Sequence, residues 1–73
     1  MNAFNTEVGY RIKEKRLELK LTRDKLANMA HISDKFLYDI EMGNKGMSAK
    51  TLYKLTQALE VSADWLLDGI EVK

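Results

Sequence analysis

Apolar side chains recur at intervals of three or four residues along most of the chain, a spacing that predicts amphipathic helices rather than strands. The first predicted helix begins after a cap at Asn5 or Thr6 and ends near Leu19. Its inner face is predicted to carry Val8, Ile12 and Leu19, with Arg16 on or beside that face. Lysine and glutamate fill the outer face.

Four hydroxyl side chains mark the starts of further helices, because such a side chain accepts a hydrogen bond from an N–H of the first turn. They are Thr22, Ser33, Ser48 and Ser62, and the helices they predict cover residues 23–30, 34–42, 49–60 and 63–68. Gly43 and Gly69 follow the third and fifth helices, where glycine commonly ends a helix. We therefore predict an all-α domain over residues 6–69, a compact bundle of five short helices, with a flexible arm at 1–5 and a tail at 70–73.

Residues 23–42 carry the most informative pattern, which is two short helices joined by a tight corner. The apolar positions that would hold these helices together are Leu26, Ala30, Ile32, Leu37 and Ile40. The small side chain of Ala27 lets the second of the two helices approach closely. This arrangement is typical of a helix-turn-helix, in which the outer face of the second helix is left free to read DNA.

The residue types exclude several classes of function. The 73 residues include no cysteine and one histidine, so neither a disulfide framework nor a metal site is expected. Apolar runs are too short to cross a membrane and no secretory signal is visible, which favours the cytoplasm. No acid–base or nucleophile pairing and no glycine-rich phosphate loop can be seen, and we therefore expect no enzyme activity and no cofactor.

Charge is unevenly distributed along the chain, although the formal net charge is only +1. Residues 1–50 hold ten Lys or Arg and seven Asp or Glu, a net of +3, whereas residues 51–73 hold two and four, a net of −2. A basic front and an acidic rear would orient the domain on a polyanion. The small total charge, however, is weak for a nucleic-acid binder.

Four segments together resemble the helix-turn-helix domain of the lambdoid phage repressor and Cro superfamily, also called the xenobiotic-response-element family. They are V-G-Y-R-I-K-E-K-R, L-T-R-D-K-L-A, I-S-D-K-F-L-Y-D-I-E-M-G and T-L-Y-K-L-T-Q-A-L-E-V-S-A-D-W-L-L-D-G. The resemblance covers about residues 6–69, and the last segment is especially specific. It implies a fold whose third helix lies in the DNA major groove.

The chain departs from the family pattern at two corners. Lys20 stands where the first helix usually ends in glycine, and His31 stands where glycine usually turns between the second and third helices. Because only glycine adopts a positive φ freely, we expect modest strain at both positions. At the start of the second helix, Arg23 replaces a common glutamine and should still reach a phosphate.

The resemblance also implies roles for particular side chains. Arg16 and Glu41 match a pair that joins the first and third helices by an ion pair in family members; the alternative is two solvated charges. The positions that match base-contacting residues are Ser33, Asp34, Lys35, Tyr38 and Asp39. The alternative is a solvated helix face, which two acids near phosphates would favour. Phe36 is expected to pack rather than to read bases.

A second set of polar residues suits DNA phosphates, namely Arg23, Asn44, Lys45 and Lys50. Arg23 begins the second helix, whose dipole also favours an anion. The loop at 44–47 can offer backbone N–H groups besides the Lys45 charge, and such contacts position a protein without reading sequence. The alternative is ordinary surface charge.

Apolar residues crowd the last ten positions, and Trp65 and Leu66 are expected to close the core. The remaining residues, Leu67, Ile70 and Val72, are predicted to form a homodimer patch, with simple core closure as the alternative. A symmetric dimer would present two copies of the third helix, roughly 34 Å apart, to successive major grooves.

The preferred hypothesis is a sequence-specific transcriptional regulator that binds double-stranded DNA, a repressor that occludes a two-fold symmetric operator as a homodimer. The chain is too short for an attached sensor domain, so we expect control by concentration, by dimerisation or by an unidentified partner protein. The alternative hypothesis is a protein-interaction module such as an antitoxin subunit, which the small net charge and the acids Asp34 and Asp39 would favour.

Overall fold

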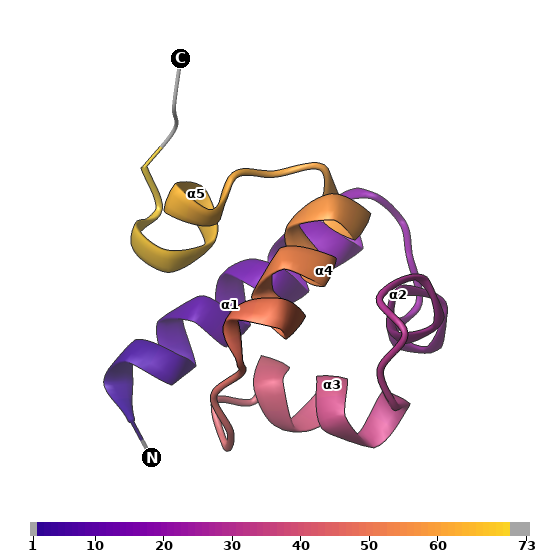
Figure 1. Cartoon of the computed structure of the whole chain (residues 1–73), viewed down its shortest axis with the longest axis horizontal. Coiled ribbons are helices and arrows are strands. Elements are labelled where there is room, and N and C mark those ends of the chain that lie inside the picture. Colours follow the sequence, from indigo (N-terminus) through magenta and orange to yellow (C-terminus); the bar gives the residue numbers. More distant parts are fainter. Residues whose placement is uncertain (1, 71–73) are drawn as a thin grey trace.

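The computed structural model describes residues 2–70, and this part of the chain is all-helical. Its helices are α1 (Ala3–Glu18), α2 (Arg23–Met29), α3 (Asp34–Glu41), α4 (Ala49–Leu59) and α5 (Ala63–Asp68). In Figure 1, α2 and α3 lie together at one end of the molecule and α5 lies at the other, with α1 and α4 between them. The predicted five-helix bundle with a helix-turn-helix is therefore the observed fold.

The core forms between the five helices, where α3 and α5 pack against α1, α2 packs against α3 and α4 packs against α5. Its fully or almost fully buried side chains are Val8, Ile12, Leu26, Ala27, Ala30, Leu37, Ile40, Leu55, Leu59 and Leu66. The predicted helix-turn-helix positions belong to this set except Ile32, which is half-buried and packs against it. Ala27 is buried, as the close approach of the two helices requires.

Hydroxyl caps begin four of the helices, at the four positions predicted. Thr22, Ser33, Ser48 and Ser62 have extended backbones, and each side-chain oxygen accepts a hydrogen bond from the N–H three residues later. These starts were predictable because a cap depends on a few neighbouring residues only.

The start of the first helix was predicted wrongly. Asn2, not Asn5 or Thr6, is the cap, since its Oδ1 accepts hydrogen bonds from Phe4 N at 2.8 Å and Asn5 N at 3.3 Å. The helix therefore begins at Ala3, and most of the segment expected to be a flexible arm is helical. Asparagine is as good a cap as serine, and the earlier site adds a further turn to the helix.

The other end of α1 also differs from the prediction. Leu19 was placed on the inner face, but the helix ends at Glu18 and the Leu19 side chain is 38% exposed. Leu21, beyond the corner, is half-buried and packs against the core.

Among residues 2–70, three non-glycine residues adopt positive φ, and two of them are the predicted corners. Lys20 has φ 60° and His31 has φ 55°, and each follows the C-cap residue of a helix. Glu60, with φ 57°, is itself the C-cap of α4 and was not predicted. The chain thus uses ordinary side chains where glycine would be free of strain.

Gly9 lets α1 approach α3 closely, and the sequence analysis did not single it out. It is buried inside α1, and a Cβ there would collide with the carbonyl oxygen of Ile40 and lie 2.8 Å from that of Glu41. The absence of a side chain therefore brings the backbone of α1 against the end of α3. This contact fixes where α3 lies on the molecule.

Candidate nucleic-acid interface

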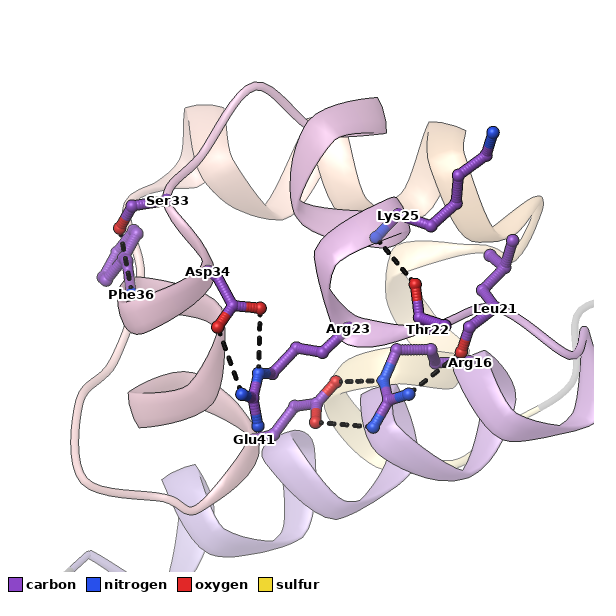
Figure 2. Close-up of polar contacts among 9 residues, drawn as sticks. All are labelled: Arg16, Leu21, Thr22, Arg23, Lys25, Ser33, Asp34, Phe36 and Glu41. Carbon is purple, nitrogen blue, oxygen red and sulfur yellow. Dashed lines mark hydrogen bonds and ion pairs between the residues drawn. The ribbon is translucent and has the colours of Figure 1, made fainter.

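Arg16 and Glu41 hold α3 to α1 through a buried ion pair. Arg16 Nε donates to Glu41 Oε2 at 2.7 Å and Nη2 donates to Oε1 at 3.1 Å, so the ion pair implied by the family resemblance forms here through two hydrogen bonds (Figure 2). Arg16 Nη1 also donates to the carbonyl of Leu21 at 2.9 Å. The pair thus joins α1, the first corner and the end of α3, and it sets the orientation of α3.

The outer face of α3 carries four of the five residues predicted to contact bases. Ser33, Lys35 and Tyr38 are exposed, and Asp34 is half-buried. The Ser33 hydroxyl accepts a hydrogen bond from Phe36 N at 3.0 Å as the helix cap. Phe36 is half-buried and packs against the core, as expected.

Asp39 was also expected on this outer face, and that expectation is wrong. Its side chain is only 6% exposed. The carboxylate lies beneath two lysines, accepting hydrogen bonds from Lys35 Nζ at 3.1 and 3.2 Å and pairing with Lys45 Nζ at 3.5 Å. The loop after α3 folds back over it, since Asn44 N and Lys45 N donate to the Asp39 carbonyl. Covered in this way, the carboxylate has no free edge for a base.

Arg23 and Asp34 form a second two-bond ion pair, between the starts of α2 and α3. Arg23 Nε donates to Asp34 Oδ1 at 3.0 Å and Nη2 donates to Oδ2 at 3.1 Å (Figure 2). The guanidinium carbon also lies 5.0 Å from the centre of the Tyr38 ring, a cation–π distance. The hydrogen bond from Arg23 is the main reason that the pKa of Asp34 lies below its ordinary value.

The acidic residues Asp34 and Asp39 of α3 therefore do not make the surrounding face negatively charged. Each of its two carboxylates is neutralised by a cation within the domain, Asp34 by Arg23 and Asp39 by Lys35 and Lys45. The remaining predicted phosphate contacts, Asn44 and Lys50, are exposed on the loop after α3 and in the first turn of α4. Of the predicted phosphate contacts, Arg23 and Lys45 pair with carboxylates of α3.

The apolar residues near the end of the chain divide between core and surface. Leu66 is fully buried, and Trp65 and Leu67 are half-buried against the core. Ile70 is 59% exposed, and Val72 lies outside the described residues. Arg11, which the sequence analysis missed, donates from Nη1 to the carbonyls of Leu66 and Leu67 at 3.1 Å each and so closes the end of α5 onto α1.

Residues 2–70 form neither a metal-binding cluster nor a membrane-spanning helix. No three His, Cys, Asp or Glu side chains of this part lie close enough together to hold a metal ion. Among the same residues, no helix combines the length and the apolar character that a membrane span needs. The surface around α3 combines exposed polar side chains, paired charges and a helix whose position is fixed by its contacts with α1.

Comparisons with known proteins agree with a helix-turn-helix domain. The profile of a family described as a helix-turn-helix domain matches residues 9–72. Over all 73 residues the chain is 34% identical to the HTH-type transcriptional regulator DicA of Escherichia coli (strain K12), of which it spans 54%. The chain spans between about half and three-fifths of the length of the curated relatives it matches.

Solved structures give the same picture. The P22 c2 repressor bound to a synthetic operator superposes with a TM-score of 0.83 at 30% identity, over 86% of this chain and 96% of that one. SinR, a Bacillus subtilis regulator of biofilm formation, superposes in its DNA complex with a TM-score of 0.80 at 34% identity, over 84% and 98% of the two chains. SinR also matches in a complex with the SinI protein, with a TM-score of 0.80.

Proposed function

This chain belongs to the helix-turn-helix domain family, and we propose that it is a sequence-specific DNA-binding transcriptional regulator. The observation that carries the proposal is the outer face of α3, which is exposed, fixed to α1 by Arg16 and Glu41, and free of unpaired acids among the described residues. A rigid helix with such a face fits the major groove. Phosphates would not be repelled, because each carboxylate already meets a cation.

Three side chains of this face have the chemistry to read bases. Tyr38 can pack against a thymine methyl group, and Lys35 can donate either to guanine O6 or N7 or to a phosphate oxygen. Asp34 can accept from cytosine N4 while Arg23, bonded to it, reaches a neighbouring phosphate. Ser33 is exposed enough to join them, although its oxygen already caps α3.

Phosphate contacts come from the surroundings of α3 in this proposal. Arg23 lies at the start of α2, Asn44 and Lys45 lie in the loop after α3, and Lys50 lies in the first turn of α4. Backbone N–H groups at the helix starts add to the attraction for anions. These contacts would dock the domain, and the α3 side chains would select the sequence.

We propose that the regulator acts as a homodimer on a two-fold symmetric operator and represses by occlusion. The exposed apolar side chain of Ile70 supports a dimer contact. The operator complex of the P22 c2 repressor and the DNA complex of SinR, both at 30% identity or more, support operator binding. Two copies of α3 would then face major grooves roughly 34 Å apart. The proposed regulator would act in the cytoplasm, and it would have neither enzyme activity nor a cofactor.

A second candidate function is binding to a partner protein. The SinR–SinI complex and the net charge of only +1 favour it. Salt dependence separates the two candidates, because a DNA reader releases counterions and loses affinity steeply, with a log–log slope of about −0.9 per phosphate neutralised. A pure partner-binding module would show little affinity for bulk duplex DNA at any salt concentration.

The test is the binding of the whole chain to bulk duplex DNA over a range of salt concentrations. Arg23→Ala should flatten the slope by about one unit per bound domain, because one phosphate contact is lost. Lys15→Ala removes the same charge from α1, where Lys15 pairs with Glu18, and should leave the slope unchanged. No measurable binding by the unaltered chain would overturn the proposal.

A further inference from the structure

We propose that Asp39 is a positioning residue that gathers Lys35 of α3 and Lys45 of the following loop into one clamp for a DNA phosphodiester. The proposal rests on the proposed DNA-binding function and assigns a new role within it. The Asp39 carboxylate lies beneath Lys35 and Lys45 and is almost completely buried, next to a face that we propose to meet a polyanion.

The cluster joins two lysines from different elements, Lys35 in α3 and Lys45 in the loop that follows it. Lys35 Nζ lies 3.1 Å from Asp39 Oδ2, and Lys45 Nζ lies 3.5 Å from the same oxygen. One carboxylate oxygen therefore holds an ammonium group from α3 and another from the loop. The Asp39 carbonyl adds two bonds to the same loop, from Asn44 N at 2.8 Å and Lys45 N at 3.3 Å.

Burial is divided unequally within this cluster. The side chain of Asp39 is 6% exposed, whereas the side chains of Lys35 and Lys45 are 79% and 61% exposed. An approaching phosphodiester therefore meets two ammonium groups, and the carboxylate lies behind them. Hydrogen bonds from Lys35 hold the pKa of Asp39 below its ordinary value, so the carboxylate remains charged near neutral pH.

An ammonium group can serve the carboxylate and a phosphate together, because it carries three N–H donors. Free lysine side chains lose much rotamer entropy when they bind, and a lysine already held by Asp39 loses less. The cluster as a whole carries one net positive charge rather than two. Asp39 thus lowers the attraction of the cluster for bulk DNA. In return it holds the two lysines in a fixed arrangement that suits a correctly docked DNA backbone.

Asp39→Asn tests this role, because it keeps the shape of the side chain and removes its charge. Asp64→Asn is the matched control, since it makes the same change in net charge at an exposed residue in the first turn of α5, outside the proposed dimer patch. Each variant is measured against a duplex selected by the unaltered chain and against bulk duplex, with the folded state checked by circular dichroism. Asp39→Asn should lower the ratio of selected to bulk affinity by roughly tenfold, through stronger bulk binding and weaker selected binding.

A role in folding alone would change the stability without changing that ratio, and an Asp39→Asn ratio equal to that of Asp64→Asn would overturn the inference. If Asp39→Asn does not fold, the two lysines carry the test. Lys35→Met and Lys45→Met should together weaken selected binding by less than the product of their separate fold-losses, because either change dissolves the same clamp. Independent fold-losses would refute the clamp. Absence of bulk binding by the unaltered chain would instead refute the DNA-binding function itself.

Discussion

The guanidinium of Arg16 meets the carboxylate of Glu41 through two parallel hydrogen bonds, with side chains that are only 9% and 3% exposed. These residues lie 25 positions apart, and their pairing fixes the end of α3 against α1. The face that we propose to read DNA is held in place by this contact and by the bare backbone of Gly9.

Removal of one partner of this pair should destabilise the domain strongly. Glu41→Gln leaves the Arg16 charge buried without its counter-ion, and we expect a loss of about 3–5 kcal/mol in the free energy of unfolding. Urea unfolding followed by the fluorescence of Trp65 measures it. Glu18→Gln, which breaks the exposed pair with Lys15, should cost less than about 1 kcal/mol. Equal losses in the two variants would mean that the buried pair contributes nothing special.

Gly9 should tolerate no larger residue. A methyl group there would collide with the carbonyls of Ile40 and Glu41, so Gly9→Ala should unfold the domain or cost at least about 3 kcal/mol, although alanine is the better helix former. Gly46→Ala is the control, because its Cβ would lie 3.4 Å from the Asn5 side chain, an ordinary contact. Thermal unfolding of both variants measures the difference, and a stable Gly9→Ala protein would contradict the α1–α3 contact.

Asp34 should titrate below the ordinary range of an aspartate. The hydrogen bonds from Arg23 favour its charged form, so its folded pKa lies below its unfolded pKa. The stabilisation it gives is therefore complete above the unfolded pKa and is lost as the pH falls through the lower, folded pKa. NMR titration of the Asp34 carboxyl carbon tests this. Arg23→Ala should move its midpoint upward, and an unmoved midpoint would refute the pairing in solution.

The surface around Ile70 should control the oligomeric state. We expect Ile70→Glu to convert a dimer into a monomer, because a charge would replace an exposed apolar side chain at the proposed contact. Sedimentation equilibrium gives the mass directly. Tyr53→Glu changes an even more exposed apolar residue on α4 and should leave the mass unaltered. An unchanged mass for Ile70→Glu would move the dimer contact elsewhere.

The sequence predicted those features that depend on near neighbours or on strong periodicity. The caps at Thr22, Ser33, Ser48 and Ser62 are local, and the apolar positions of α2 and α3 follow helical spacing. The pairing of Arg16 with Glu41 and the positive φ of Lys20 and His31 came from the family resemblance instead.

The sequence failed where two distant segments meet. The family resemblance implied that Asp39 lies on the outer face with Tyr38, but the loop after α3 and its Lys45 fold over Asp39 and bury it. The sequence alone does not distinguish Gly9 from the other glycines, because its role depends on the contact between α1 and α3. The pairing of Arg23 with Asp34 likewise required the angle between α2 and α3, so a predicted phosphate contact and a predicted base contact proved to be partners.

Selection of bound sequences from a random duplex library tests the central claim most directly, because it asks whether the face of α3 reads DNA. The account predicts one enriched, two-fold symmetric sequence with half-sites about one helical turn apart, and Tyr38→Ala should relax the preference at a defined position in each half-site. Enrichment of no sequence, or an identical sequence from Tyr38→Ala, would contradict it.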